Sequence, residues 1–262
     1  MYNRLDFILP WYVDDYADLN AEQEAFLDEQ LEPFLVWHRS TELPTYVILL
    51  EQIELRLDRT WTEDEVAVVF GEFEQAWFRT ENEMLDWALE LGAQLSDDQV
   101  DGLVEELNEK QLEYEEEYLP RTDEEFRRDS YESMLETGTD YLGRLDGEQR
   151  NTLLAASESL MRSDNFWLQE RAKFLARLEV LLDRQPGWQQ QVKALVDERD
   201  SNASPEYHEV LAHNTVVLQQ LTADLLNSRT PKQDAHLRKR LTKLRTDLEV
   251  LIAEGKEAQS VD

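Results

Sequence analysis

The sequence predicts an all-α protein, an elongated bundle of about nine helices that pack mostly antiparallel. The 262 residues include only 8 glycines and 7 prolines, so long stretches contain no helix breaker. Those stretches are rich in Leu, Glu, Ala, Gln and Arg, which lose little conformational freedom in a helix. In one of them the leucines step by three or four residues, as on one face of an amphipathic helix: Leu237, Leu241, Leu244, Leu248 and Leu251.

Helix starts are marked by an N-cap residue that is followed three positions later by Glu or Gln. In such a capping box each of the two side chains accepts a hydrogen bond from the backbone N–H of the other residue. Six pairs fit the pattern: Asn20 with Gln23, Thr62 with Glu65, Ser96 with Gln99, Thr122 with Glu125, Asp146 with Gln149, and Thr230 with Gln233. Ser204 followed by Pro205 adds a seventh start, because proline suits the first helical position.

Helix ends are predicted where Gly, Pro and short polar residues interrupt the pattern. These positions are Pro44, Gly92, Pro120, Gly143, Pro186-Gly187 and the segment 200–203. Together with the starts, they divide the chain into about nine helices joined by short loops.

Four of the starts share a glutamine followed four residues later by leucine. The glutamines are Gln23, Gln99, Gln149 and Gln233, separated in turn by 76, 50 and 84 residues. This spacing is too irregular for a solenoid with a fixed period. We interpret the recurrence as repeated capping and not as a repeat fold.

The formal net charge of -32 is distributed unevenly. Residues 1–150 hold 41 acidic and 11 basic residues, whereas residues 151–262 hold 17 and 15. We treat residues 1–262 as a single helical domain, with a possible subdivision into an acidic half, 1–143, and a near-neutral half, 144–262.

A chain with this net charge repels polyanions, which excludes nucleic acid as a partner. The acidic half is either a docking face for a basic partner or a solvated surface that self-repulsion keeps soluble.

Cysteine is absent, which excludes disulfides, thiolate nucleophiles and Cys-ligated metals. No apolar run approaches the roughly 18 to 20 residues of a membrane span. The segment 5–13 is aromatic and apolar, so it could seat at a membrane interface or dock onto the helical body.

No constellation of residues predicts an active site. Helical bundles build di-metal sites from Glu-x-x-His pairs, but none of the four histidines has Glu three residues before it. His208 and His213 resemble a zinc-protease motif, yet five residues separate them by about 140° around a helix. The sequence also lacks a Gly-x-Ser-x-Gly elbow and a Gly-rich phosphate loop. We therefore predict no catalytic residue, no metal site and no cofactor.

One helix-to-helix junction departs from the plain amphipathic pattern. Bulky, cationic and acidic side chains crowd it, and five of them are candidates for a protein-binding corner: Trp37, His38, Arg39, Glu42 and Tyr46. In the alternative interpretation, Arg39 and Glu42 cap backbone ends while the aromatic rings pack together.

A further set of short motifs is spread over nearly the whole chain, and together they carry a family resemblance. They are Tyr2-Asn3, Leu5-Asp6, Pro10-Trp11, Asp18-Leu19-Asn20, Glu22-Gln23, Trp37-His38-Arg39, Glu42-Leu43-Pro44, Tyr46, Leu145-Asp146, Glu148-Gln149, Ser204-Pro205, Tyr207, Asn214, Thr230-Pro231, Gln233, His236-Leu237, Arg240, Leu244, Arg245, Asp247 and Leu248. In these motifs the sequence resembles the uncharacterised envelope lipoproteins of proteobacteria that carry a conserved helical domain of unknown function.

Members of that family look like exported proteins whose lipid-bearing cysteine lies a short way before the Tyr-Asn segment. The resemblance implies a periplasm-facing domain, tethered to the outer membrane through a lipid anchor that this chain lacks. It implies that the chain begins just after the anchor cysteine. It implies no activity, because the function of the family is unassigned.

A second resemblance is to periplasmic helical chaperones that carry a Leu-Thr-x-x-Gln motif. The four glutamine starts approximate this motif, although only the last has the threonine, Thr230, and there Arg229 stands where leucine belongs.

These observations predict a non-enzymatic lipoprotein domain that acts as a protein-binding adaptor or scaffold in the bacterial envelope. The expected binding surfaces are the corner from Trp37 to Tyr46 and the acidic N-terminal half. The expected partners are proteins of unknown identity, and membrane contact is expected only through the lipid anchor. Two alternatives stay open: a periplasmic holdase, which needs an exposed apolar concavity, and a metal-dependent helical hydrolase that uses carboxylates or His208.

Overall fold

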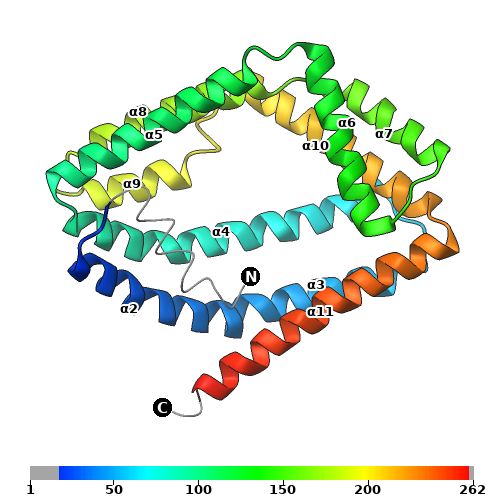
Figure 1. Cartoon of the computed structure of the whole chain (residues 1–262), viewed down its shortest axis with the longest axis horizontal. Helices are drawn as coiled ribbons and strands as arrows, with labels where there is room; N and C mark the ends of the chain where they lie inside the picture. The colour runs from blue at the N-terminus through cyan, green and yellow to red at the C-terminus, as the bar shows by residue number, and fades with distance from the viewer. Residues whose placement is uncertain (1–17, 260–262) are drawn as a thin grey trace. The chain divides into compact units, whose positions relative to one another are not determined.

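The structure, a computed structural model, describes residues 18–259, and the apolar segment 5–13 lies outside them. Residues 18–259 form ten α-helices, one π-turn and no strand (Figure 1). The elements are α2 (Ala21–Trp37), the π-turn η2 (His38–Glu42), α3 (Leu43–Arg56), α4 (Glu63–Gln94), α5 (Asp97–Tyr118), α6 (Asp123–Leu142), α7 (Gly147–Ser159), α8 (Asp164–Leu181), α9 (Trp188–Asp197), α10 (Pro205–Ser228) and α11 (Pro231–Gln259). α2, η2 and α3 follow one another without a break and form one continuous helical run. With the eight other helices, residues 18–259 contain nine such runs. The predicted all-α class with about nine helices is confirmed.

All six predicted capping boxes are formed. At α6 the Thr122 N–H donates to Glu125 Oε2 at 2.8 Å, and the Glu125 N–H donates to Thr122 Oγ1 at 3.2 Å. The same reciprocal pair begins the helices at Asn20, Thr62, Ser96, Asp146 and Thr230. Each such cap stabilises its helix by about 1 kcal/mol, so the starts are fixed locally.

The helix end predicted at Pro44 is wrong, because helical structure runs through this residue. Proline lacks an N–H, and in a regular α-helix its ring clashes with the carbonyl four residues earlier. The π-turn just before Pro44 widens the helix, and the Leu43 N–H donates to the His38 carbonyl five residues back. Pro44 then stands in the first turn of α3, where its missing N–H costs nothing.

The other predicted ends agree with the structure. Gly92 lies two residues before the last residue of α4. Pro120, Gly143, Pro186-Gly187 and the segment 200–203 all lie between helices.

The chain forms two compact units, each assembled from three separate segments. Unit 1 comprises Met1–Leu35, Arg79–Pro120 and Ser163–Glu209, and unit 2 comprises Val36–Phe78, Arg121–Arg162 and Val210–Asp262. The possible subdivision at 143/144 does not separate the units, since Leu142 and Leu145 both belong to the core of unit 2. Unit 1 is the more acidic unit, with 32 acidic and 9 basic residues against 26 and 17 in unit 2.

Unit 1 has its own hydrophobic core, to which α2, the end of α4, α5 and the α8–α9 segment contribute. Its buried side chains are Leu19, Leu27, Trp87, Leu89, Leu91, Leu95, Val100, Leu182, Trp188 and Val192. A polar contact also joins α5 to α8: buried Gln111 donates to the Leu168 carbonyl at 3.1 Å and accepts a hydrogen bond from Arg171 at 2.6 Å. The pairing of α5 with α8 thereby satisfies the buried amide.

Unit 2 has a second, separate core. α11 packs along α3 and also contacts α6 and η2 (Figure 1). The buried side chains of this core are Leu50, Leu57, Trp61, Val66, Leu142, Leu145, Leu153, Ala156, Leu221, Ala223, Leu225, Leu237 and Leu241. Leu153 and Leu237 are two of the leucines that follow the motif glutamines, so the motif also supplies core residues.

In each unit two helix starts are joined through their capping-box glutamines. In unit 1 Gln23 Nε2 donates to Gln99 Oε1 at 3.0 Å, and Gln99 Nε2 donates to Gln23 Oε1 at 2.8 Å. In unit 2 Gln149 Nε2 donates to Gln233 Oε1 at 3.1 Å, and Gln233 Nε2 donates to Gln149 Oε1 at 2.8 Å. We call each of these arrangements an amide pair.

Backbone groups at equivalent positions complete both amide pairs. Each Oε1 also accepts the N–H of its own N-cap residue. Each Nε2 also donates to the carbonyl two residues before the partner's N-cap: Gln23 to Gln94, Gln99 to Asp18, Gln149 to Ser228, and Gln233 to Arg144. Because every amide donor and acceptor is used, these side chains can be buried at little cost. The four recurrent starts are thus two copies of one paired arrangement, one copy in each unit.

Arg229 departs from this arrangement, since leucine precedes the N-cap at the other three starts. Its guanidinium donates to the carbonyls of Leu57 and Leu226, which lie at the ends of α3 and α10. Its Nε also pairs with Asp234 of α11 at 2.8 Å, and its side chain is only 10% exposed. Arg229 therefore joins three helices of unit 2 where a leucine could contribute only packing.

Candidate functional site

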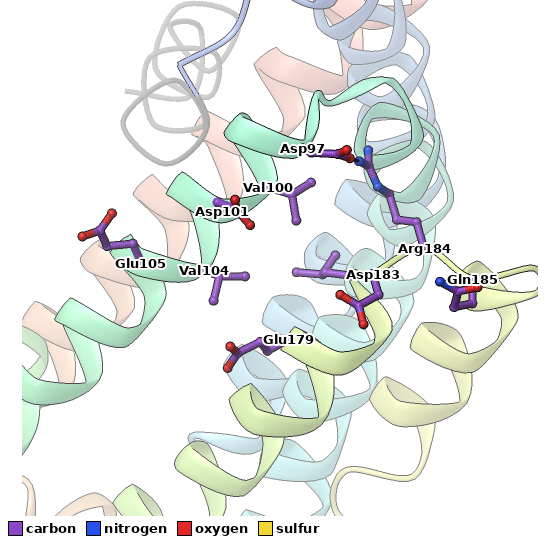
Figure 2. Close-up of a pocket in the computed structure, with 10 residues that line it drawn as sticks. Asp97, Val100, Asp101, Val104, Glu105, Glu179, Asp183, Arg184 and Gln185 are labelled. Atoms are coloured by element: carbon purple, nitrogen blue, oxygen red, sulfur yellow. Dashed lines mark hydrogen bonds and ion pairs between the residues drawn. The ribbon is translucent and has the colours of Figure 1, made fainter.

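The acidic groove is an open cavity of about 470 Å³ in unit 1 (Figure 2). It lies between α5 and the end of α8, and its lining is Asp97, Val100, Asp101, Val104, Glu105, Glu179, Leu182, Asp183, Arg184 and Gln185. Five of these ten residues are carboxylates, so the groove concentrates the charge of the more acidic unit.

Helical spacing explains how the carboxylates are arranged. Asp101 and Glu105 are four residues apart on α5, so they project from one face of that helix. Glu179 and Asp183 have the same spacing along the end of α8 and the turn that follows. Figure 2 shows the two pairs on opposite sides of the groove, with the side chain of Val104 between them.

Arg184 is the one basic residue in the lining of the acidic groove. Its guanidinium donates to the carbonyl of Leu95, just past the end of α4, and pairs with Asp97. Its backbone adopts a left-handed conformation, with φ of 56°, in the turn after α8. The arginine therefore caps the end of α4 and neutralises Asp97, which leaves the other four carboxylates to dominate the groove.

This geometry suits the binding of cationic groups. Carboxylates on two sides can pair with Lys or Arg side chains. Val100, Val104 and Leu182 form the apolar floor of the groove, which can contact the aliphatic stems of those side chains. A basic protein segment has both properties.

The structure brings the five residues of the predicted corner together in unit 2, on and beside the π-turn. The centroids of the Trp37 and His38 rings are 6.1 Å apart, and those of His38 and Tyr46 are 6.0 Å apart. A Cβ atom placed on Gly255 would lie 3.0 Å from Arg39 Cβ, so α11 passes close to the π-turn at this point. Such π-turns are rare and are found frequently at functional sites.

Burial limits what this corner offers to a partner. Glu42 is only 1% exposed, whereas the other four side chains are half-buried. Burial lowers the pKa of His38, an effect that the nearby Glu42 carboxylate partly offsets and Arg39 reinforces. The aromatic packing fits the alternative interpretation of a structural junction, and binding through the corner stays a prediction.

The histidines contact carbonyl groups or aromatic rings. His213 Nε2 lies 2.8 Å from the Ser159 carbonyl oxygen, and His236 Nε2 lies 3.2 Å from that of Asp140. Across the described part of the chain, no three His, Asp or Glu side chains form a group that could hold a metal ion. No helix in the same residues is both long and apolar enough to cross a membrane.

Fold and groove together define an all-α protein with an open acidic groove in unit 1. The chain belongs to a family of unknown function, DUF6279, which matches residues 15–208. This match confirms the predicted membership of an uncharacterised family. No curated protein and no solved structure matches the chain.

Sequence reasoning identified the acidic half but not the acidic groove. The signal on α5 was readable, because Asp101 and Glu105 stand beside Val100 and Val104 at helical spacing. The other wall comes from a segment about eighty residues later, and no pattern in the sequence shows that α8 lies beside α5.

Proposed function

We propose that this chain is a non-enzymatic protein of the bacterial envelope that binds other proteins as an adaptor or scaffold. The observation that carries the proposal is the acidic groove, where two pairs of carboxylates flank an apolar floor. The partner would present a basic segment to the groove. The periplasm-facing location and the lipid tether rest on the sequence resemblance to envelope lipoproteins.

The charge of unit 1 supports a role for the groove in association. An excess of acidic residues attracts a basic partner over a distance of about one Debye length, roughly 8 Å at physiological ionic strength. Complementary charge of this kind raises association rates and selects against acidic partners. Binding should therefore weaken as the salt concentration rises.

The experiment compares partners captured in native envelopes by the wild-type chain and by two charge-reversed variants. Asp101→Arg with Glu105→Arg alters the acidic groove. Asp28→Arg with Glu32→Arg makes the same change in net charge at two exposed positions of α2 in unit 1, outside the lining of the groove, and serves as the control. After amine-reactive crosslinking and mass spectrometry, we expect the groove variant to recover at least about tenfold less of one dominant partner than wild type or the control.

Two results would contradict the proposal. An equal loss in both variants would show that net charge and not the groove governs capture. Capture of many unfolded proteins, in place of one dominant partner, would support a holdase instead.

A further inference from the structure

Unit 2 contains a second opening, which we call the apolar groove. Its volume is about 450 Å³, within the roughly 300–1,000 Å³ typical of ligand sites. Leu218, Leu221 and Leu225 of α10 line it together with Leu237 of α11 and Phe70 of α4. The lining is therefore mostly apolar, in contrast to that of the acidic groove.

The apolar groove has the length of two turns of helix. On α6 the lining runs from Ser133 to Leu142, which is about 13 Å at the rise of an α-helix. On α10 it runs from Leu218 to Leu226, about 12 Å. Three anchor side chains of a bound helix, at i, i+4 and i+7, span about 10 Å. A groove of this length can take all three.

One rim of the apolar groove carries a row of carboxylates. Ser133 and Thr137 line the groove from α6 and are exposed, so they mark its open side. Glu132, Glu136 and Asp140 are also exposed, stand four residues apart and lie next to this lining on the helix surface. Asp140 makes only a loose pair with Arg240, at 3.9 Å. The row would repel an anionic lipid and attract basic side chains.

Two large aromatic side chains are exposed on α4 beyond the groove. Phe73 and Trp77 lie three and seven residues after Phe70, so the three aromatic side chains share one face of the helix. Phe73 is 52% exposed and Trp77 is 64% exposed, which is unusual for such large apolar residues. Large apolar side chains exposed beside a groove are a feature of protein-interaction sites.

We infer that the apolar groove of unit 2 binds an amphipathic helix of a partner protein. The apolar face of that helix would fill the groove, and basic residues along its edge would meet Glu132, Glu136 and Asp140. This second site is separate from the acidic groove of unit 1, and it does not depend on the function proposed for that groove.

The test measures binding of a labelled helical peptide to the whole chain by fluorescence anisotropy. The peptide carries Leu at i, i+4 and i+7 and Lys on the flanking positions, and the control peptide has the same composition in scrambled order. We expect the ordered peptide to bind at least about tenfold more tightly than the scrambled one. Both charge-reversed variants are made in a chain that already carries Asp101→Arg with Glu105→Arg, so that the lysines cannot bind the acidic groove. In that chain Glu132→Arg with Glu136→Arg should weaken binding about tenfold, whereas Asp28→Arg with Glu32→Arg, at exposed positions outside both grooves, should change it less than about twofold.

A second variant, Thr137→Arg, places a bulky cation on the open rim and should also weaken peptide binding about tenfold. Circular dichroism checks that each variant keeps the helical content of wild type. Equal binding of ordered and scrambled peptides would overturn the inference, as would equal effects of the two charge-reversed variants. Binding of dodecanoate without binding of the peptide would overturn it in favour of a lipid site.

Discussion

Gln149 and Gln233 stand 84 residues apart in the chain, yet their side-chain amides hold each other in two hydrogen bonds of 3.1 and 2.8 Å. The two side chains are 1% and 5% exposed, so neither amide can exchange these bonds for bonds to water. The amide pair thereby fixes the start of α7 against the start of α11.

The amide pair predicts a measurable coupling. Gln149→Ala and Gln233→Ala should each lower the free energy of unfolding by about 1–3 kcal/mol, because each leaves a buried partner amide unsatisfied. The double variant should lose less than the sum, by about 0.5–3 kcal/mol. Urea unfolding followed by circular dichroism measures these values. Gln190→Ala, on the exposed face of α9, should change stability by less than about 0.5 kcal/mol, and strictly additive losses would contradict the pairing.

Arg229→Leu restores the leucine found before the N-cap at the other three starts, and we expect it to destabilise the protein. The change removes the donor to the carbonyls of Leu57 and Leu226, so unfolding free energy should fall by about 1–3 kcal/mol. Arg229→Lys should lose less, since an ammonium can still donate to one of the carbonyls. If leucine raised the urea midpoint, the arginine would have no joining role.

Gly143 ends α6 with φ of 75° and ψ of -149°, a conformation that a residue with a Cβ atom adopts only with strain. Gly143→Ala should therefore cost about 1–3 kcal/mol of unfolding free energy. Gly102 provides the control, because it lies inside α5 and, apart from its chain neighbours and the backbone of its own helix, nothing lies within 4 Å of a Cβ placed there. Gly102→Ala should stabilise the protein by about 0.5–1 kcal/mol, and thermal unfolding measures both changes.

His38 predicts a loss of stability in weak acid. Burial lowers the pKa of His38 in the folded chain, while its pKa in the unfolded chain is about 6.5. Between these two pKa values the unfolded chain binds more protons than the folded chain. The contribution of His38 to stability therefore falls as the pH drops below about 6.5.

The measurement compares urea midpoints at about pH 7.5 and about pH 5.5. His38→Gln should lose less stability than wild type over this interval. His208→Gln, at an exposed position, should behave as wild type does. Identical pH dependence in all three proteins would show that His38 does not titrate as described.

Local features of the fold could be predicted from the sequence because their causes are local. A capping box such as Ser96 with Gln99 spans four residues, and its hydrogen bonds form wherever the helix forms. Leucine spacing likewise gave the helices their apolar faces. The π-turn before Pro44 was missed, because a proline inside a helical pattern ordinarily ends the helix.

Pairings between distant segments could not be predicted in the same way. The glutamines were recognised as a recurrent group, but capping alone explained each of them. Nothing in the chain showed that Gln23 meets Gln99 or that α5 and α8 enclose a groove. These contacts depend on tertiary packing, and no periodic pattern in a single sequence shows which distant segments pack together.

The central claim, that the acidic groove binds a protein partner, is tested most directly by site-specific photocrosslinking in native envelopes. A photoreactive residue replaces Gln185, which lines the groove, or Gln190, which is exposed elsewhere in unit 1. We predict one dominant crosslinked protein from position 185, none from position 190, and loss of the product when Asp101→Arg and Glu105→Arg are added. The same products from both positions, or a product that survives the charge reversal, would contradict the account.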